Sequence, residues 1–171
     1  MFKLAAVIPT YNNPLTLQSV VDGVKSYCGY VIVVDDGSDK EGAEVANNLT
    51  EIDLIRNAKN IGKGPSLAKG LKRALEMSKR TVELEPENST YLDTYAWILH
   101  KLGRNSEAKT ILKQAMVYGG NENADILDHY AEVLFALGEK DLAYIYWGQA
   151  HKLDPSLDIA AKVEKIKSGK R

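Results

Sequence analysis

Two segments in the first half of the chain carry polar residues that could bind a small ligand. Asp35 and Asp36 come directly after Val31–Val34, and Lys63 stands between two glycines. Such a carboxylate pair can bind a ligand, begin a turn or act in acid–base catalysis, and we rank these roles in that order. Lys63 adds a cation for phosphate on a flexible backbone. The spacing fits neither a P-loop nor a GxGxxG fingerprint.

The other reactive side chains show no catalytic or metal-binding spacing. His100, His129 and His151 lack partners at i, i+4 that could form a metal site. Cys28 is the single cysteine, which excludes an internal disulfide and a multi-cysteine zinc site. We therefore predict no catalytic residue and no metal ligand.

Charge and hydropathy exclude several classes of protein. The 171 residues carry 22 Lys and Arg against 23 Asp and Glu, and this net charge of -1 gives no support to phosphate-driven nucleic-acid binding. No run approaches the roughly 20 apolar residues that span a bilayer, so we expect no membrane span. The apolar run at residues 4–8 is too short for a signal peptide, and we expect a cytoplasmic protein.

Short β-rich runs alternate with helical stretches up to about residue 64, a pattern typical of βαβ units with a parallel sheet. The predicted strands are Leu4–Ile8, Val31–Val34 and Ile52–Ile55. Asn13 and Pro14 predict the start of a helix that runs to about Tyr27, and a second helix is expected over Glu41–Leu49. Parallel sheets bind ligands at the loops that follow the carboxyl ends of their strands. The polar residues described above are therefore expected at the edge where ligands bind.

From about Ser66 onward the chain reads as helices, and it contains an internal repeat. A set of residues recurs 35 positions later with unchanged identity; the first copies are Leu92, Asp93, Tyr95, Ala96, Leu99, Leu102, Gly103, Ala108 and Ala115. The large apolar members form one helix face, Gly103 ends that helix, and the small alanines let a second helix pack closely. The repeat predicts an array of helical hairpins.

This pattern resembles the tetratricopeptide repeat, in which large apolar, small, aromatic, Gly, Ala and Pro positions follow in the same order. The resemblance divides residues 74–171 into a half repeat at 74–88, repeats at 89–122 and 123–157, and a capping helix at 156–167. Residues 1–73 form the other predicted domain, and the two domains share a helix from about Pro65 to Leu84. Because the array begins in the middle of a repeat, we expect the chain to be a chimera of the two domains. Either a natural or an engineered fusion would explain it.

A second helix face in the repeats is expected to bind a partner. The resemblance to tetratricopeptide repeats implies a concave groove lined by residues at helical spacing. They are Asp93, Trp97 and His100 in the first repeat and Asp128, Glu132 and Phe135 in the second. An acidic groove with Trp97 and Phe135 as apolar anchors favours a neutral or basic peptide. The alternative is a solvated surface that binds nothing.

Three segments of the first half resemble the beginning of the family 2 glycosyltransferases, which have the GT-A fold. They are Ala6–Asn12, Val33–Ser38 and Asn60–Gly64. The resemblance covers about residues 2–77 and implies a Rossmann-like fragment that holds the nucleotide of a sugar donor. It implies that Thr10 and Tyr11 line the nucleotide site. It also implies that Asp36 accepts a hydrogen bond from the base and that Lys63 lies near the base or the phosphates.

The resemblance ends where the chemistry of that family begins. Its members carry an Asp-x-Asp motif that holds a divalent metal, and later a carboxylate base. No Asp-x-Asp occurs in this sequence, and Glu83-x-Glu85 falls in a segment with the repeat-helix pattern. We therefore expect a non-catalytic binding or scaffold protein without a cofactor, with at best weak affinity for a nucleoside diphosphate. The alternative is a glycosyltransferase whose catalytic half comes from a partner, and that alternative would need Mn or Mg.

The first strand is expected to lie at an edge of the sheet. In the GT-A fold a fourth strand pairs along its far side, and the sequence offers no such strand. An exposed apolar edge recruits another chain. We therefore expect a homodimer, or aggregation, through residues 4–8, unless a helix covers that edge.

Overall fold

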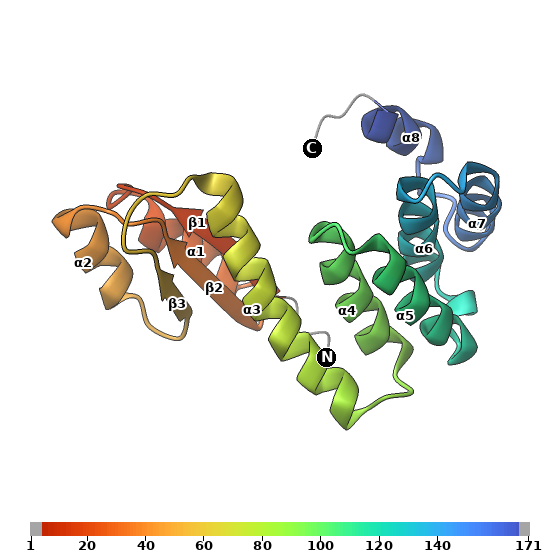
Figure 1. Cartoon of the computed structure of the whole chain (residues 1–171), viewed down its shortest axis with the longest axis horizontal. Coiled ribbons are helices and arrows are strands. Elements are labelled where there is room, and N and C mark those ends of the chain that lie inside the picture. Colours follow the sequence, from red (N-terminus) through yellow and green to blue (C-terminus); the bar gives the residue numbers. More distant parts are fainter. Residues whose placement is uncertain (1–4, 168–171) are drawn as a thin grey trace. The chain divides into compact units, whose positions relative to one another are not determined.

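The chain forms two compact units that meet after Met77, inside the long helix α3 (Lys63–Leu84) (Figure 1). The computed structural model describes the backbone of residues 5–167 and the side chains of residues 5–164. Leu4, the first residue of the predicted edge strand, lies outside the described residues, as do residues 168–171 of the second predicted domain. The continuous α3 confirms the predicted shared helix.

A three-stranded parallel sheet forms the centre of the first unit, as predicted. Its strands are β1 (Ala5–Thr10), β2 (Tyr30–Asp35) and β3 (Asp53–Arg56), and their spatial order is β1-β2-β3. Among the described residues β1 pairs with β2 alone, so it lies at an edge of the sheet. Residues 31–34 of the central strand are buried, which confirms the prediction of a strand covered on both faces.

Helices α1 (Leu17–Lys25) and α2 (Lys40–Asn48) pack against one face of this sheet. Their core is made of Leu17, Val21, Val31, Val33, Ala46 and Leu49. Helix α3 approaches β1 and β2 at Gly70, where an added Cβ would lie 2.2 Å from Val7 Cγ1 and 3.1 Å from Val34 Cγ2. The helix can come this close only because glycine lacks a side chain.

The first helix begins later than the sequence predicts. The hydroxyl of Thr16 donates a hydrogen bond of 2.9 Å to Asn13 Oδ1, and this local turn precedes the helix. Such side-chain bonds compete with helix formation. Pro14 therefore lies in the turn, and α1 ends at Lys25 rather than at Tyr27.

Helical hairpins form the second unit. Their helices are α4 (Ser89–Lys101), α5 (Asn105–Val117), α6 (Ala124–Ala136), α7 (Lys140–Leu153) and α8 (Ile159–Lys167), with a short 3₁₀ turn η1 (Gly120–Glu122) between the two repeats. Helix α4 packs on α5 and α6 packs on α7, while α6 also contacts α4 and α5. The predicted small residues Ala108, Ala115, Ala143 and Ala150 are fully buried at these contacts.

The 35-residue repeat extends to the helix ends. The side chain of Asn88 accepts hydrogen bonds from the first backbone amides of α4, and Asn123 does the same for α6. Gly103 and Gly138 follow α4 and α6 with φ of 78° and 85°, a left-handed conformation that favours glycine. Gly103 thus ends its helix as predicted, whereas the sequence analysis did not single out the two asparagine caps.

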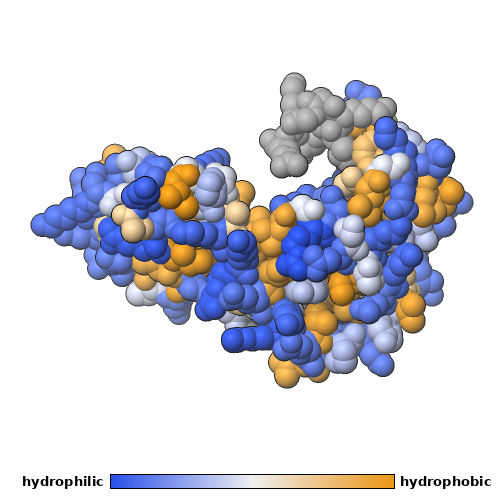
Figure 2. Space-filling model, in the orientation of Figure 1, coloured by the Kyte–Doolittle hydropathy of each residue, from blue (hydrophilic) through white to orange (hydrophobic). Residues whose placement is uncertain are grey.

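On the face that Figure 2 shows, hydrophobic side chains lie among hydrophilic ones. The most exposed of the large apolar side chains on α7 are Tyr144, Ile145 and Leu153. Within residues 5–167, no helix combines the length and the apolar character needed to cross a membrane.

Candidate functional site

The last residues of the three strands lie in one row at the carboxyl edge of the sheet. The strand register pairs Thr10 with Asp35, and Asp35 with Arg56. Arg56 Nε lies 3.3 Å from Asp35 Oδ2, and the guanidinium is about half exposed. The row therefore presents a hydroxyl, a carboxylate and a cation side by side. Arg56 was missed in the sequence analysis, although its place at the end of β3 matches that of Asp35 at the end of β2.

Two oxygens of this row are buried and lack a hydrogen-bond partner. They are Thr10 Oγ1 and Asp35 Oδ2. Thr10 is 8% exposed and Asp35 is 0% exposed, while Asp35 Oδ1 accepts a hydrogen bond from the Ser38 backbone at 3.0 Å. The ion pair with Arg56 neutralises Asp35 without forming a hydrogen bond to Oδ2. Buried polar atoms are normally satisfied, so these two oxygens mark a place where a polar ligand or water can bind.

Asp36 stabilises a loop of its own chain. Its carboxylate accepts hydrogen bonds from Asn57 Nδ2 at 2.8 Å and from the backbone amides of Ile61 at 2.9 Å and Gly62 at 2.8 Å. Burial raises the pKa of Asp36, but these hydrogen bonds outweigh it and hold the pKa below its ordinary value. A nucleotide base would have to compete with these donors for the carboxylate.

A buried polar network continues from Asp36 into α3. Asn57 Nδ2 also donates to Ser66 Oγ at 2.9 Å, and Lys69 Nζ donates to Asn57 Oδ1 at 2.5 Å. Asn57 and Ser66 are both buried. The sequence analysis missed these three residues; the available signal was that Asn57 follows β3 as Asp36 follows β2.

The remaining predicted nucleotide-site residues belong to the same edge. Tyr11 directly follows Thr10 and is 49% exposed. Lys63 is exposed and begins α3, one residue after the loop amides that bind Asp36. The backbone amide of Asp36 donates to the Thr10 carbonyl at 2.8 Å, so the loops after β1 and β2 are joined there. The structure thus brings the segments that carry Thr10, Tyr11, Asp36 and Lys63 to one edge.

Gly37 allows the loops at this edge to pack closely. It has a φ of 74°, and an added Cβ would lie 2.5 Å from the backbone carbonyl carbon of Lys59. Any side chain here would strain the turn and collide with the loop that holds Asp36.

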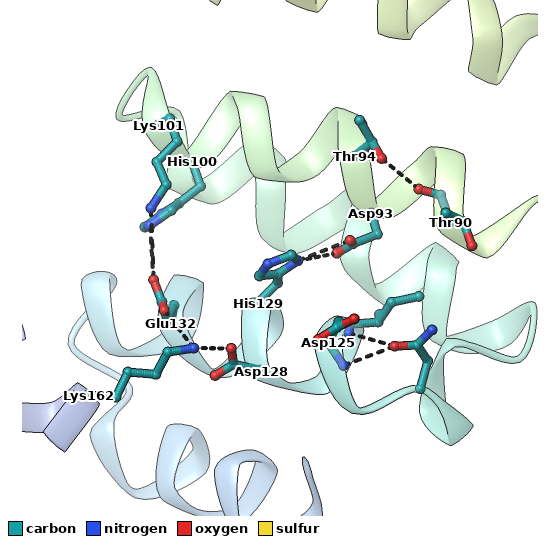
Figure 3. Close-up of polar contacts among 12 residues, drawn as sticks. Thr90, Asp93, Thr94, His100, Lys101, Asp125, Asp128, His129, Glu132 and Lys162 are labelled. Carbon is teal, nitrogen blue, oxygen red and sulfur yellow. Dashed lines mark hydrogen bonds and ion pairs between the residues drawn. The ribbon is translucent and has the colours of Figure 1, made fainter. Parts of the chain in front are cut away.

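In the second unit, α4 and α6 share a polar face that we call the α4–α6 face. It comprises Asp93, Trp97, His100, Asp128, His129 and Glu132. His129 Nδ1 lies 2.9 Å from Asp93 Oδ1 and 3.0 Å from Oδ2, so this pair links α6 to α4 (Figure 3). His129 also stacks on Trp97 with ring centroids 3.9 Å apart.

Asp128 joins three helices of the second unit. Its Oδ1 accepts a hydrogen bond of 2.9 Å from Nε1 of the fully buried Trp147 on α7, and its Oδ2 accepts one from Lys162 on α8. Lys162 Nζ also lies 3.1 Å from Glu132 Oε1. The predicted groove acids are therefore paired within the chain.

Aromatic rings and cations surround Trp97 at the end of α4. The ammonium of Lys101 lies 3.7 Å from the ring centroid of Trp97, and the ring of His100 stacks at 5.1 Å. His100 Nδ1 is 2.8 Å from Asn105 Oδ1. Burial, the largest effect on His100, lowers its pKa below the ordinary value.

Phe135 lies apart from this cluster. Its ring contacts Tyr144 and Trp147 of α7, with centroids 6.3 Å and 5.5 Å away. The structure therefore gathers Asp93, Trp97, His100, Asp128 and Glu132 on one face and places Phe135 against the next helix. Among the described residues no group of three His, Cys, Asp or Glu side chains is placed to hold a metal ion.

These two units define a chain of mixed class, in which a glycosyltransferase-like α/β part is joined to a tetratricopeptide-like helical array. Residues 5–76 match the model of glycosyl transferase family 2. The uncharacterized protein MJ0544 of Methanocaldococcus jannaschii is 31% identical over 81 residues, which cover 44% of this chain and 35% of that protein. The chain thus spans about a third of the length of this curated relative.

Solved structures resemble the helical part. One is TTC0263, a thermophilic tetratricopeptide-repeat protein of Thermus thermophilus, which superposes on this chain with a TM-score of 0.51 at 20% sequence identity. The superposition covers 63% of this chain and 53% of the TTC0263 chain. MamA AMB-1 gives a TM-score of 0.45 at 22% identity, over 53% of this chain and 54% of its own. The likeness to TTC0263 confirms the fold expected from the 35-residue repeat.

Proposed function

We propose that this chain is a non-catalytic binding protein, a chimera of a nucleotide-sugar half-site and a protein-interaction array. The observation that carries the proposal is the pair of buried oxygens without hydrogen-bond partners, Thr10 Oγ1 and Asp35 Oδ2. They lie at the edge where parallel sheets bind ligands. Arg56 and Lys63 add cations at the same edge, which favours a nucleoside diphosphate or a nucleotide sugar.

The helical array contributes the second binding activity. Its fold supports the binding of a peptide or protein segment, and the half-buried ring of Trp97 offers an aromatic anchor. The single cysteine agrees with a reducing cytoplasmic setting.

The edge position of β1 favours self-association of the chain through this strand. A molecular mass that rises with protein concentration in light scattering would support this self-association. A monomer at high concentration would contradict it.

Calorimetric titration with UDP and other nucleoside diphosphates tests the nucleotide half-site. We expect saturable, weak binding that a Thr10→Val variant loses, because valine keeps the shape of threonine and removes its hydroxyl. Thr50→Val is the matched control, since Thr50 is exposed and lies at the other end of α2. Equal binding by both variants, or no binding by the unmodified chain, would contradict the proposal.

The second candidate function is a family 2-like glycosyltransferase whose catalytic half comes from a partner. The match of residues 5–76 to that family supports it. No Asp-x-Asp motif that could bind the metal occurs in this sequence, so we expect no turnover of a nucleotide sugar by the isolated chain. Metal-dependent release of UDP from a UDP-sugar by the isolated chain would contradict the non-catalytic proposal.

A further inference from the structure

We propose that Lys162 of α8 occupies a lysine-binding position on the α4–α6 face, and that a partner segment binds there by presenting its own lysine in place of Lys162. This inference rests on the proposed protein-interaction function of the array. It adds that the partner segment carries a lysine and that Lys162 controls access to the lysine-binding position.

The contacts of Lys162 define the position. Its ammonium donates to Asp128 Oδ2 and lies 3.1 Å from Glu132 Oε1 (Figure 3). The acceptor side chains are only 6% and 15% exposed, whereas that of Lys162 is 29% exposed. Burial lowers the pKa of Lys162, but the hydrogen bond and the charges of the two acids outweigh it and raise the pKa. The position is thus matched to a charged ammonium that approaches from the solvent side.

The two comparable acids on this face, Asp93 and Asp128, differ in how firmly the helix that carries their partner is held. Asp93 binds His129, which belongs to α6, and α6 packs extensively against α7. Asp128 binds Lys162 of α8, and among the described residues no packing of α8 on another helix matches that of α6 on α7. Helix α8 follows the connection 154–158 and buries Val163. Moving α8 aside would free Asp128 and Glu132 while the α4–α7 hairpins stay in place.

The neighbouring groups favour a basic partner over an acidic one. Glu132 also lies 3.9 Å from the ammonium of Lys101 and 4.0 Å from the ring of His100, so a second cation is near it. When Lys162 leaves, Asp128 and Glu132 lose their closest positive charge, and an incoming lysine or arginine restores it. An acidic segment would leave Asp128 without a cation and would bring further negative charge beside two partly buried carboxylates, which is costly.

A peptide with the sequence of residues 155–167 provides a probe that matches the internal occupant. Labelled with fluorescein and titrated by anisotropy, it should bind the full chain carrying Lys162→Ala about tenfold more tightly than the unmodified chain, because the tethered competitor acts at a high effective concentration. Lys152→Ala, which removes an exposed lysine of α7, should leave the affinity unchanged. A probe peptide with alanine at its own position 162 should bind about tenfold more weakly.

The acceptor side gives an independent variant. Adding Glu132→Gln to Lys162→Ala should weaken the peptide again, and Glu132 is preferable to Asp128 because Asp128 also holds the buried Trp147. Circular dichroism and tryptophan fluorescence show whether each variant is folded, and Lys162→Met keeps the aliphatic stem if alanine loosens α8. Equal peptide affinity for the unmodified chain and both folded Lys162 variants would overturn the inference.

Panning a random peptide library on the Lys162→Ala chain separates this inference from the proposed function. Selected lysine-bearing peptides that compete with the probe support both. Selected peptides that bind the unmodified and Lys162→Ala chains equally would leave the interaction function standing and refute the role of Lys162. If no peptide is selected and the probe does not bind, both proposals fail.

Discussion

The carboxyl edge of the sheet and the α4–α6 face both gather acids, but the acids find different partners. At the sheet edge, Asp35 and Asp36 accept hydrogen bonds mainly from backbone amides of the loops that surround them. On the α4–α6 face, Asp93 and Asp128 pair with side chains of a following helix. Backbone partners fix a loop in one conformation, whereas side-chain partners join helices and can be exchanged for another cation.

This difference indicates how each region would bind a ligand. Within residues 5–164 the two buried side-chain oxygens without a hydrogen-bond partner both lie at the sheet edge. A ligand that reaches these two oxygens would satisfy hydrogen-bond acceptors that lack a donor. On the α4–α6 face the acids already have partners, so a ligand would replace one. The predictions below test whether the two regions are as independent as this contrast implies.

The largest effect is expected at Trp147, whose buried indole joins α7 to Asp128. Trp147→Ala should lower the free energy of unfolding of the second unit by about 3–5 kcal/mol, because it leaves a large cavity and removes the hydrogen bond to Asp128 Oδ1. Urea unfolding followed by circular dichroism measures this loss. Trp97→Ala is the control, and its half-buried ring should cost clearly less. Equal losses of unfolding free energy in the two variants would contradict the prediction that the more buried tryptophan contributes more to stability.

A smaller loss is expected in the first unit at Gly70. Gly70→Ala should destabilise it by about 1–3 kcal/mol, since the new methyl group collides with Val7 on β1. Gly64→Ala lies in the same helix with open space around it and should be neutral or slightly stabilising. Both tryptophans belong to the second unit, so circular dichroism should register the Gly70 change while tryptophan fluorescence does not. If the urea midpoint measured by tryptophan fluorescence shifts by the same amount, the two units unfold together.

Acid should weaken the sheet edge through Asp36. Its pKa is lowered in the folded chain from an ordinary value of 3.8, so its contribution to stability is fully present above that value and is lost as the pH falls below it. Asp36→Asn should therefore reduce the acid sensitivity of the first unit, measured as the urea midpoint by circular dichroism. Asp22→Asn on the exposed face of α1 serves as the control. An unchanged acid profile in Asp36→Asn would contradict the assigned hydrogen bonds.

The smallest effect is expected from His100 in the second unit. Burial lowers the pKa of His100 from 6.5, so stability is fully present above that value and declines as the pH falls from 6.5 toward the lowered pKa. His100→Gln should flatten this decline in the urea midpoint by tryptophan fluorescence, while His151→Gln at an exposed position should not. A steeper decline of the urea midpoint with falling pH in His100→Gln would contradict a lowered pKa for His100.

The fold could be predicted because periodicity and repetition are properties of the sequence. The apolar run Val31–Val34 predicted a buried strand, and the 35-residue repeat predicted paired helices and the end of α4 at Gly103. The start of α1 was predicted too early because the hydrogen bond between Thr16 and Asn13 favours a turn, and spacing alone does not reveal that competition.

The candidate site was predictable in location but not in detail. Motif position places Thr10 and Asp36 at strand ends, yet it does not show that Asp36 is already bonded to the loop at residues 57–62. Arg56 reaches the site through the register of β3 with β2, and the predicted strand Ile52–Ile55 ended one residue before it. Likewise, the pairing of Asp128 with Lys162 depends on how α8 packs, so the groove acids looked free from the sequence alone.

The central claim is that the chain holds a nucleotide at the sheet edge and not on the helical array. A titration of the ¹⁵N-labelled chain with UDP, followed by two-dimensional NMR, tests it most directly. We predict saturable shifts of the amide signals of residues 10–12, 35–38 and 56–62, with the signals of α4–α7 unchanged. Shifts confined to the helical array, or no saturable shift at the sheet edge, would contradict the account.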